Sequence, residues 1–216
     1  MAEPLEVHML TLGPLEANCF VLVRGQHALV IDPGDEADVV ISAFTQLGLA
    51  PAAVLVTHGH FDHCGAVAEV ARRFAAPVYI GTADAAALVD PGSSPIGGGN
   101  VEALGGKPRL LAGEQVLDLP LSLAAIPTPG HSPGSYTFSV EEHLFCGDLV
   151  FHGSVGRTDL PGGSIDQLLN SIADLVRRYP PDTAVHCGHG PDTSLGRELA
   201  LNPFLSPLRY DPGHRW

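Results

Sequence analysis

The first 75 residues of the chain alternate between short apolar runs and polar or glycine-containing turns. Three runs, VHMLTLG, CFVLVRG and HALVIDPG, are rich in β-branched residues and end at glycine, which predicts three strands. Apolar residues then recur at helical spacing over 36–47, and this pattern predicts a helix. A short apolar strand, AVLVTH, and a second helical run, GAVAEVARRFA, follow with a loop between them. That loop leaves the carboxyl end of a strand, where open α/β sheets usually bind their ligands.

A second β-rich block occupies the middle of the chain and is followed by a well-marked helix. LSLAAIPTPGH, SYTFSV and HLFCGDLVF have the composition of strands. A helix is predicted from Ser164 to Tyr179, since Ser164 and Gln167 match a capping box and Pro180 ends the pattern. The strand TAVHCGHG and a final helix near Leu195–Leu201 complete the order. No linker or literal repeat divides the two halves, so we expect one domain over the whole chain of 216 residues.

The segment from Asp90 to Pro108 is the richest in glycine and proline. Its sequence, DPGSSPIGGGNVEALGGKP, predicts a flexible loop. Such a loop is either a lid over a binding site or a plain surface connection, and the sequence favours neither interpretation.

The composition is that of a globular protein that folds by itself. Hydrophobic residues make up 45% of the chain and charged residues only 16%. No stretch approaches the roughly 20 uninterrupted apolar residues that span a bilayer, and the start, MAEPLEVHML, has acidic residues where a signal peptide needs basic ones. We therefore expect a cytoplasmic protein without a membrane partner.

The charge balance is strongly acidic and argues against nucleic acid as a partner. Aspartate and glutamate number 24 against 11 lysines and arginines, which gives a formal charge of −13 and would repel a polyanion at long range. The four cysteines are scattered without a CxxC pair, so we predict neither a disulfide framework nor a zinc ribbon. Small buried thiols are the favoured interpretation of Cys19, Cys64, Cys146 and Cys187.

The sequence THGHFDHCG, at 57–65, directly follows an apolar strand and contains three histidines and one aspartate. Residues two apart in an extended segment point to the same side, so His58 and His60 can bind one metal ion together. Asp62 and His63, at the turn into the helix, can face a second ion. A loop of solvated histidines is the alternative, but such a string after a buried strand is improbable by chance. A metal site is therefore the favoured interpretation.

Three further strand ends offer residues that would complete such a site. PTPGHSPGS contains His131, CGDLVF contains Asp148, and CGHGPDT contains His189. Each lies beside glycine, where the backbone can approach a buried ion closely. Any one of them alone would be interpreted as an ordinary loop residue, but together with the first four they fit one site.

Five segments, IDPG, THGHFDH, PGHSPG, GD and GHG, in this order and spacing, resemble the metallo-β-lactamase superfamily. The resemblance covers nearly the whole chain and implies an α/β fold, the αββα sandwich, in which two mixed β-sheets pack face to face with helices on the outer faces and metals along one edge. It further implies that one ion is held by His58, His60 and His131, a second by Asp62, His63 and His189, and that Asp148 bridges them. Asp32, in IDPG, is expected to hydrogen-bond a ligand or to shape its loop.

Shorter strings narrow the resemblance to type II glyoxalases (hydroxyacylglutathione hydrolases), in particular the short bacterial form. These strings are NCFVL at 18–22, GRTDLPGGS at 156–164, and GHGPDTSLGRE followed by NPFL. True β-lactamases usually have another residue where this chain has Asp148, so antibiotic hydrolysis is disfavoured. Long glyoxalases bind the glutathione carboxylates with basic residues of an added C-terminal domain. Here only the tail from Leu205 to Trp216, with Arg209 and Arg215, and the Asp90 to Pro108 loop could substitute.

The resemblance implies hydrolysis of an acyl thioester, S-lactoylglutathione or a related thiol ester. Two divalent ions, Zn²⁺ first and Fe or Mn as alternatives, would lower the pKa of a water that bridges them and polarise the thioester carbonyl. We expect Asp62 and Asp148 to take part in catalysis as well as in metal binding. With hydroxide bound, a local charge of about +1 remains to attract a small anionic substrate. Arg157 and Arg197 could add to it, although surface salt bridges are the favoured role of both.

Other functions compete with thioester hydrolysis. Persulfide dioxygenases are similar in their ligands and in the GRTD string, but use a single iron held by residues that correspond to His58, His131 and Asp148. A metal-binding module without catalysis ranks lower, because all seven expected ligands are present. Nucleases of the superfamily are disfavoured, since the chain lacks a basic patch and large insertions. Cys64 and Cys187 neighbour the metal-site strings, but the ligand set is complete without a thiolate, so we do not expect them to act as nucleophiles.

Overall fold

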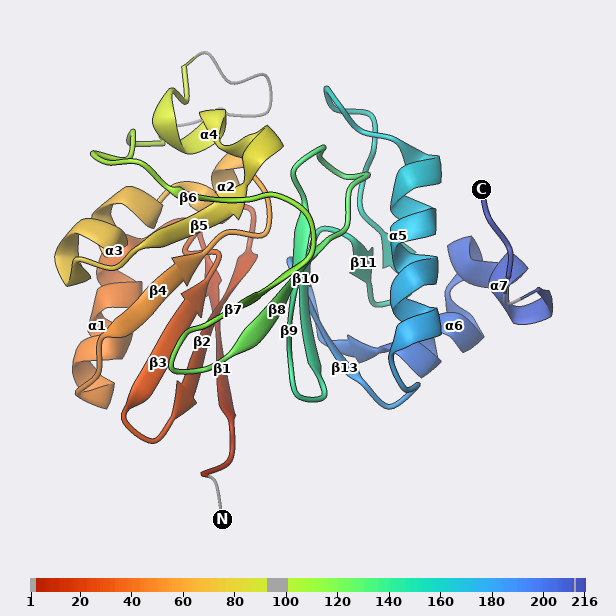
Figure 1. Cartoon of the computed structure of the whole chain (residues 1–216), viewed down its shortest axis with the longest axis horizontal. Coiled ribbons are helices and arrows are strands. Elements are labelled where there is room, and N and C mark those ends of the chain that lie inside the picture. Colours follow the sequence, from red (N-terminus) through yellow and green to blue (C-terminus); the bar gives the residue numbers. More distant parts are fainter. Residues whose placement is uncertain (1–2, 93–100, 212) are drawn as a thin grey trace.

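The computed structural model describes residues 3–92, 101–211 and 213–216, which form two six-stranded mixed β-sheets, a short two-stranded ribbon and several helices (Figure 1). The first half of the chain forms sheet A, in the strand order β1-β2-β3-β4-β5-β6. Its elements are β1 (Glu6–Leu12), β2 (Ala17–Arg24), β3 (His27–Ile31), α1 (Ala37–Leu47), β4 (Pro51–Leu55), α2 (Phe61–Cys64), α3 (Val67–Phe74), β5 (Val78–Gly81), η1 (Thr82–Asp84), α4 (Ala86–Val89) and β6 (Arg109–Leu111).

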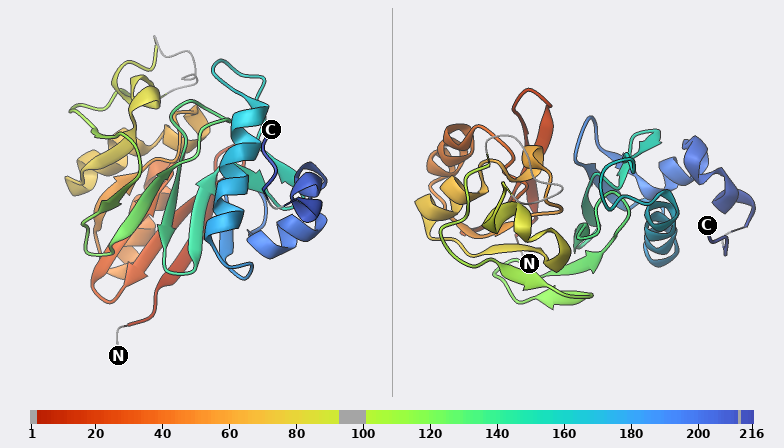
Figure 2. Two further views of the ribbon diagram at one scale, coloured as in Figure 1. Left: turned by 45° about the vertical axis from the view of Figure 1, so that its right-hand side comes forward. Right: turned by 90° about the horizontal axis from the view of Figure 1, so that it is seen from above.

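The second half forms sheet B, in the strand order β14-β13-β10-β9-β8-β7, and the ribbon of β11 and β12. Its elements are β7 (Gln115–Leu117), β8 (Leu123–Pro127), β9 (Tyr136–Val140), β10 (His143–Gly147), β11 (Val150–Phe151), β12 (Ser154–Val155), α5 (Ile165–Arg178), β13 (Ala184–Cys187), β14 (Thr193–Ser194), α6 (Leu195–Leu201), η2 (Pro203–Leu205) and α7 (Ser206–Tyr210). The two sheets face each other, with α1 and α3 outside sheet A and α5 and α6 outside sheet B (Figure 2). These four layers confirm the αββα sandwich.

The pairing of the strands directs several strand ends to the same edge of each sheet. In sheet A, β2 pairs antiparallel with β1 and β3, whereas β3, β4, β5 and β6 run parallel. In sheet B, β10 pairs parallel with β13 and antiparallel with β9, which pairs antiparallel with β8. Strands β8, β10 and β13 therefore run in one direction, as do β3, β4 and β5. Their carboxyl ends carry the loops with the predicted site residues.

Side-chain alternation along the strands divides the interior into three apolar clusters. On β2, Val21 packs with α1 and α3, while Phe20 and Leu22 pack between the sheets with Phe145 of β10. The third cluster packs sheet B against α5, α6 and α7 and includes Leu168. Because both faces of the central strands are covered, they appear in the sequence as continuous apolar runs rather than alternating ones.

Two predicted helices lie where the sequence indicated. Helix α5 begins after Ser164, whose hydroxyl oxygen accepts a hydrogen bond from the Gln167 backbone N–H at 3.4 Å, a cap that typically contributes ~1 kcal/mol. It ends at Arg178, one residue before the predicted end, and α6 spans the predicted 195–201. Among the described residues no helix has the length and apolar character needed to cross a bilayer.

The single helix predicted over GAVAEVARRFA is in fact preceded by a separate turn, α2. Two close contacts with the loop after β3 separate α2 from α3. The Ala66 backbone N–H donates to the Pro33 carbonyl at 3.1 Å, and a Cβ added to Gly65 would lie 2.3 Å from the Gly34 carbonyl oxygen. The segment THGHFDH is therefore held against the loop after β3 as well as against its own strand.

The predicted Asp90 to Pro108 loop lies partly within the described residues. Residues 93–100 lie outside the described residues, and 101–108 form neither helix nor strand. The Leu104 backbone N–H donates to the Leu88 carbonyl at 2.7 Å, which anchors the second part of the loop on α4. A lid function for this loop stays a prediction.

Candidate metal centre

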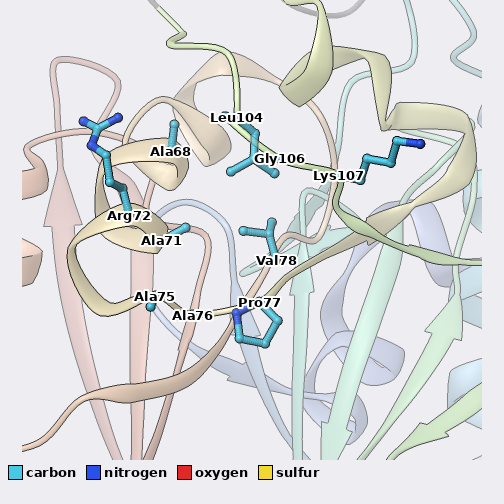
Figure 3. A pocket seen from close by; sticks show the side chains of 11 residues that line it. Ala68, Ala71, Arg72, Ala75, Ala76, Pro77, Val78, Leu104, Gly106 and Lys107 are labelled. Carbon is cyan, nitrogen blue, oxygen red and sulfur yellow. The ribbon is translucent and has the colours of Figure 1, made fainter.

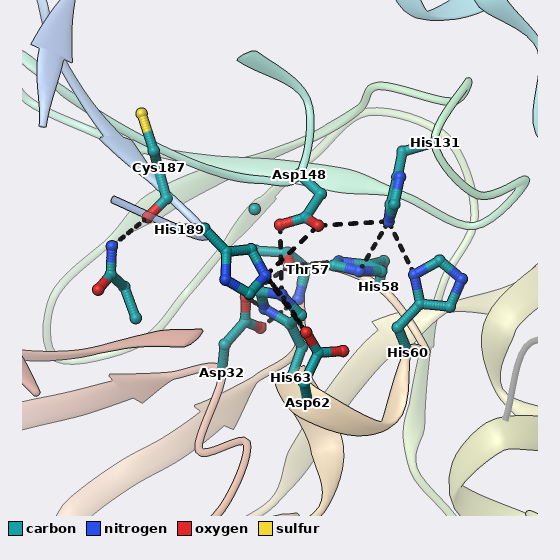
Figure 4. Close-up of polar contacts among 12 residues, drawn as sticks. Asp32, Thr57, His58, His60, Asp62, His63, His131, Asp148, Cys187 and His189 are labelled. Atoms are coloured by element: carbon teal, nitrogen blue, oxygen red, sulfur yellow. Dashed lines mark hydrogen bonds and ion pairs between the residues drawn. The ribbon is translucent and has the colours of Figure 1, made fainter. Parts of the chain in front are cut away.

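All residues of the predicted metal site lie together, beyond the carboxyl ends of strands from both sheets (Figure 4). His58 and His60 follow β4, Asp62 and His63 lie in α2, His131 follows β8, Asp148 follows β10 and His189 follows β13. The structure thus brings together side chains from both sheets that are up to 131 positions apart in the sequence, His58 and His189 being the outermost pair. That these side chains bind metal stays a prediction.

His58, His60 and His131 form a first trio, in which each residue offers one ring nitrogen within 4.8 Å of the others. His131 Nε2 lies 3.2 Å from His58 Nε2 and 2.7 Å from His60 Nδ1. All three side chains are buried. Three imidazoles that converge in this way are a common donor set for zinc and similar divalent ions.

Asp62, His63 and His189 form a second trio of the same kind. His189 Nε2 lies 3.2 Å from Asp62 Oδ2 and 3.4 Å from His63 Nε2. His63 is fully buried, but the side chains of His189 and Asp62 are 28% and 14% exposed. The second trio is therefore the part of the centre that solvent reaches.

Asp148 lies between the two trios (Figure 4). Its Oδ1 is 3.2 Å from His63 Nε2, and its Oδ2 is 3.6 Å from both His131 Nε2 and His189 Nε2. Gly188 makes this approach possible, because a Cβ there would lie 2.2 Å from Asp148 Oδ1. One carboxylate can thus serve both trios, as the predicted bridging role requires.

Four of the five histidines are oriented by oxygen atoms outside the centre. The Nδ1 contacts are Thr57 Oγ1 for His58 at 3.0 Å, Asp32 Oδ2 for His63 at 3.0 Å, the Arg157 carbonyl for His131 at 2.7 Å and the Leu15 carbonyl for His189 at 3.1 Å. The Thr57 hydroxyl itself donates to Asp32 Oδ2 at 2.5 Å, so it accepts from His58. These acceptors assign the ring proton to Nδ1 and leave a lone pair on each Nε2.

The resulting lone pairs point at one another and at carboxylate oxygens. Such an arrangement is repulsive unless a cation lies between the atoms, and outer acceptors of this kind are how metal-binding imidazoles are usually oriented. His60 has the opposite orientation, since its Nδ1 faces His131 while its buried Nε2 has no hydrogen-bond partner among the described residues. The cluster therefore fits a divalent metal site.

The pKa shifts of the site histidines and of Asp148 also indicate that the centre favours a bound cation. Burial lowers the pKa of His58 well below its usual value and that of His60 to about 4, which keeps both rings neutral, as metal ligands must be. Burial also lowers the pKa of His63, but the Asp148 and Asp32 carboxylates outweigh burial and raise this pKa above its usual value. Burial raises the pKa of Asp148, but the neighbouring imidazoles, His63 first, lower it to about 2. The carboxylates thus attract a cation, while His58 and His60 resist protonation.

Asp32 has the role expected from the sequence, since it hydrogen-bonds His63. It also accepts the Thr57 backbone N–H at 2.7 Å, and through the Thr57 hydroxyl it orients His58. Sequence reasoning missed Thr57 and the two backbone carbonyls, Leu15 and Arg157, that hold the outer nitrogens. A carbonyl has no signature in the sequence, so only the fold could identify the last two.

Asn18 is a further residue whose role the sequence did not indicate. Its Nδ2 donates to the Cys187 carbonyl at 3.0 Å and to the Gly190 carbonyl at 2.8 Å, and its backbone N–H donates to the Gly188 carbonyl at 2.8 Å. A strand of sheet A thereby holds the loop of sheet B that carries His189. The string NCFVL supported the family resemblance, and a polar residue inside this apolar strand was the available signal.

The cysteines and arginines behave as predicted. All four thiols are free and buried. Burial raises the pKa of Cys64, and a hydrogen bond with Cys146 together with burial raises that of Cys187, so neither forms a thiolate readily. Arg157 pairs with Asp159 at 2.7 Å and Arg197 with Glu198 at 2.6 Å, which confirms salt bridges for both arginines.

A pocket of about 380 Å³ lies away from the centre, at the amino end of β5 (Figure 3). It is lined mainly by alanines of α3 and of the turn that follows it, by Pro77 and by Val78, with Arg72 and Lys107 on opposite sides. Arg72 is already paired with Glu102 at 2.7 Å. The pocket contains none of the predicted site residues and is separate from the metal centre.

Comparisons with known proteins agree with this geometry. The sequence model of the metallo-β-lactamase superfamily matches residues 12–189. A Bacillus subtilis protein named probable metallo-hydrolase YqgX is 39% identical over 203 residues, which cover 90% of this chain and 95% of the relative. Hydroxyacylglutathione hydrolase GloC of Haemophilus influenzae is 29% identical over 209 residues, which cover 94% of this chain and 99% of the relative.

Solved structures share the same fold. The B3 metallo-β-lactamase BLEG-1 is 39% identical with a TM-score of 0.87, covering 93% of this chain and 100% of that one. TTHA1623, solved in a di-iron-bound form, is 40% identical with a TM-score of 0.72, covering 92% and 100%. ETHE1 from Myxococcus xanthus, at 20% identity, a TM-score of 0.77 and coverage of 97% and 92%, shows likeness of fold alone. The chain belongs to the metallo-β-lactamase superfamily, and it combines the fold of that superfamily with a cluster of histidines and aspartates that fits a divalent metal ion.

Proposed function

We propose that the protein is a dinuclear metal-dependent hydrolase of acyl thioesters, similar to type II glyoxalases. The observation that carries this proposal is a single carboxylate, Asp148, within 3.6 Å of histidines from two separate ligand trios. The relative named hydroxyacylglutathione hydrolase and the neighbour solved with two irons support it.

The donor set suggests which ions the centre would hold. One ion would be held by His58, His60 and His131, the other by Asp62, His63 and His189, with Asp148 shared between them. Imidazole and carboxylate donors suit Zn²⁺, which we place first, and also iron and manganese. When bound, two such ions supply hydroxide near neutral pH and polarise a carbonyl group.

The carboxylates favour a substrate whose leaving group needs no proton. The pKa of Asp148 is lowered to about 2. Burial raises the pKa of Asp62, but the hydrogen bond with His189 and the charge of His63 together outweigh burial and lower it. Both groups therefore stay ionised at neutral pH, where they orient charge and accept protons but do not donate them. A thiolate, with a thiol pKa of about 8.5, leaves without an acid. This property supports a thioester over an amide.

The open side of the centre indicates where the substrate approaches. The first trio is buried, whereas His189 and Asp62 are partly exposed, so the substrate would enter over the second trio. We propose a small anionic thioester as this substrate. Nucleic acid is not proposed as a partner, because the net charge is −13. A single domain in the cytoplasm remains our proposal for organisation and location.

A persulfide dioxygenase is the second candidate. Its single iron would use His58, His131 and Asp148, which lie together here, His131 Nε2 being 3.2 Å from His58 Nε2 and 3.6 Å from Asp148 Oδ2. The fold neighbour ETHE1 motivates this comparison. The equally well-oriented second trio favours two ions, since Asp32 and the Leu15 carbonyl already orient His63 and His189.

Parallel assays on one preparation test the proposal. Protein loaded with Zn²⁺, Fe²⁺ or Mn²⁺ is assayed for thiol release from S-lactoylglutathione, oxygen uptake with glutathione persulfide, and opening of a chromogenic cephalosporin. We expect thiol release alone, lost in His58→Ala. Persulfide-dependent oxygen uptake with one iron per chain would establish the dioxygenase instead. Cephalosporin opening without thiol release, or no activity with two ions bound, would also overturn the proposal.

A further inference from the structure

Asp84, at the end of η1, is a fully buried carboxylate that the proposed reaction does not use. Its Oδ2 accepts the Gly59 backbone N–H at 2.9 Å and the Ser132 hydroxyl at 2.6 Å, and its Oδ1 accepts the Gly134 backbone N–H at 2.8 Å. Gly59 lies between His58 and His60, and Ser132 directly follows His131. One side chain thus joins the two loops that carry the first trio.

The packing around Asp84 leaves these loops little freedom. A Cβ on Gly134 would lie 2.5 Å from the Asp84 carboxyl carbon, and a Cβ on Gly81 would lie 2.1 Å from the Gly134 carbonyl oxygen. The loop reaches the carboxylate only because both positions lack a side chain. The Ser135 hydroxyl lies 2.7 Å from the Ser132 hydroxyl and accepts the Ser132 backbone N–H at 3.2 Å, which completes the network.

The charge of Asp84 is also unusual for its surroundings. All three of its partners donate, so the carboxylate accepts only and is ionised in this network. Burial has the largest effect and raises the pKa of Asp84 above its usual value, although the bonds from Ser132, Gly59 and Gly134 and the charge of His131 lower it in part. Among the residues described, no arginine, lysine or histidine is within ion-pair distance of it. A buried charge of this kind is costly unless a cation lies near, and the first trio lies directly beyond its loops.

The second trio has supports that do not involve Asp84. His63 is held by Asp32 and the His189 loop by Asn18, and neither residue hydrogen-bonds Asp84. We propose that Asp84 is a positioning residue for the first trio: it fixes the distance between the His60 and His131 loops and so sets the affinity for one of the two ions selectively. This inference rests on the proposed function only in requiring that the trios bind metal.

Metal affinity in the variant Asp84→Asn tests the inference. An amide presents an N–H where the carboxylate accepted one, so at least one loop must lose its bond. Competition of Zn²⁺ between the protein and a chelator should show one binding step weakened by about 10- to 100-fold, the range typical of lost outer-sphere partners, and the other within about threefold. Ser132→Ala, which removes one bond and leaves the carboxylate, should weaken the same step less.

Glu198→Gln is the matched control. Glu198 is also a buried carboxylate with several partners, accepting from the Gly153 backbone N–H, Thr193 and Asn202, but it contacts none of the predicted ligands. The Glu198→Gln variant should have a lower melting temperature than the wild type when metal-free, while both zinc affinities should be unchanged. Equal weakening of both steps in Asp84→Asn, or a fall in stability without any change of affinity, would overturn the inference.

Combining Asp84→Asn with the loss of a ligand from either trio shows which of the two ions is bound more weakly. In His189→Ala, which removes a ligand of the second trio, Asp84→Asn should still weaken the remaining ion by about the same factor. In His58→Ala, which removes a ligand of the first trio, Asp84→Asn should have no further effect on zinc affinity. An effect in His58→Ala but none in His189→Ala would contradict the proposal. The zinc affinities answer this question even if no thioester is hydrolysed, so failure of the proposed activity remains distinct. A wild-type chain that binds no zinc would refute both.

Discussion

At the scale of single residues, the centre depends on how each donor atom is oriented. Asp148 is the residue on which both trios converge, and its pKa of about 2 keeps it charged at any pH where the enzyme would work. Because it contributes charge rather than apolar packing, its removal should disturb the reaction more than the fold.

Asp148→Ala should lower thioester hydrolysis by roughly 10²- to 10³-fold, the usual scale for removing one electrostatic group from an active site. The metal-loaded variant should remain folded, which its circular dichroism spectrum would verify. Asp182→Ala, at an exposed aspartate, is the control and should keep full activity. Unchanged turnover in pure Asp148→Ala protein would remove this residue from the mechanism.

Cys64→Ala and Cys187→Ala should keep most of the activity. Both thiols are buried with raised pKa values, and the Cys64 thiol donates to the His60 carbonyl at 3.1 Å rather than facing the centre. Each substitution removes one buried sulfur atom, so a modest loss of stability is expected. If turnover disappeared while both metals stayed bound, a thiol would have to be part of the chemistry.

The metal-free protein should lose stability as the pH falls from about 6.5 to about 4. His60 has its pKa lowered from 6.5 to about 4, so the unfolded chain binds a proton in this range that the folded chain refuses. Asp148 extends the loss below pH 3.8 towards its own pKa of about 2. The raised pKa of His63 changes stability only above pH 6.5, so it does not affect this range. Thermal unfolding after chelator treatment should therefore depend less on pH in His60→Gln than in the wild type. His27→Gln, at an exposed histidine, should match the wild type, and an unchanged slope in His60→Gln would refute the assignment.

At the scale of elements, the site is held by contacts between the two sheets. Long or well-capped elements were predictable: α5 has a cap and a buried apolar face, and α6 has a regular pattern. Strands of two or three residues, such as β7, β11 and β14, carry no periodicity that a sequence reveals, and the break between α2 and α3 depends on a distant loop. The clustering of the seven predicted site residues could be expected from the sequence because histidine and aspartate strings at strand ends are rare. Asn18 and Asp84 were not, because their role depends on partners far away in the sequence.

Asn18→Ala should weaken the link between β2 and the loop after β13. It removes two hydrogen bonds, one to the buried Cys187 carbonyl and one to the Gly190 carbonyl, which should cost about 1–3 kcal/mol of unfolding free energy. It should also loosen the His189 loop and reduce the affinity for one ion. Asn202→Ala is the matched control, since Asn202 is buried and its side chain donates to the Ser154 carbonyl and to Glu198, away from the centre. An equal loss of metal affinity in both variants would show a general effect of stability.

At the scale of the whole molecule, the two arginines of the C-terminal tail that could recognise glutathione are already engaged. Arg209 donates to the Leu199 and Asn202 carbonyls, and Arg215 pairs with Asp174 at 2.7 Å. The C-terminal tail itself lies along α5, where Trp216 and Asn170 exchange hydrogen bonds. Remote parts of a substrate contribute to catalysis only where protein groups contact them.

Replacing S-lactoylglutathione by a truncated lactoyl thioester should therefore reduce kcat/KM only modestly. We expect a penalty below about 3 kcal/mol, the upper end for losing a charged hydrogen bond. Comparing the two substrates on one metal-loaded preparation gives this difference directly. A larger penalty would mean that a dedicated glutathione pocket exists.

The central claim is that one carboxylate and two ligand trios make a two-ion hydrolytic centre. The most direct test is a titration of metal-free protein with Zn²⁺ in which thiol release from an acyl thioester is followed at each addition. We predict that activity rises mainly between the first and the second equivalent and then reaches a plateau. Full activity at one equivalent, or none at two, would contradict the account.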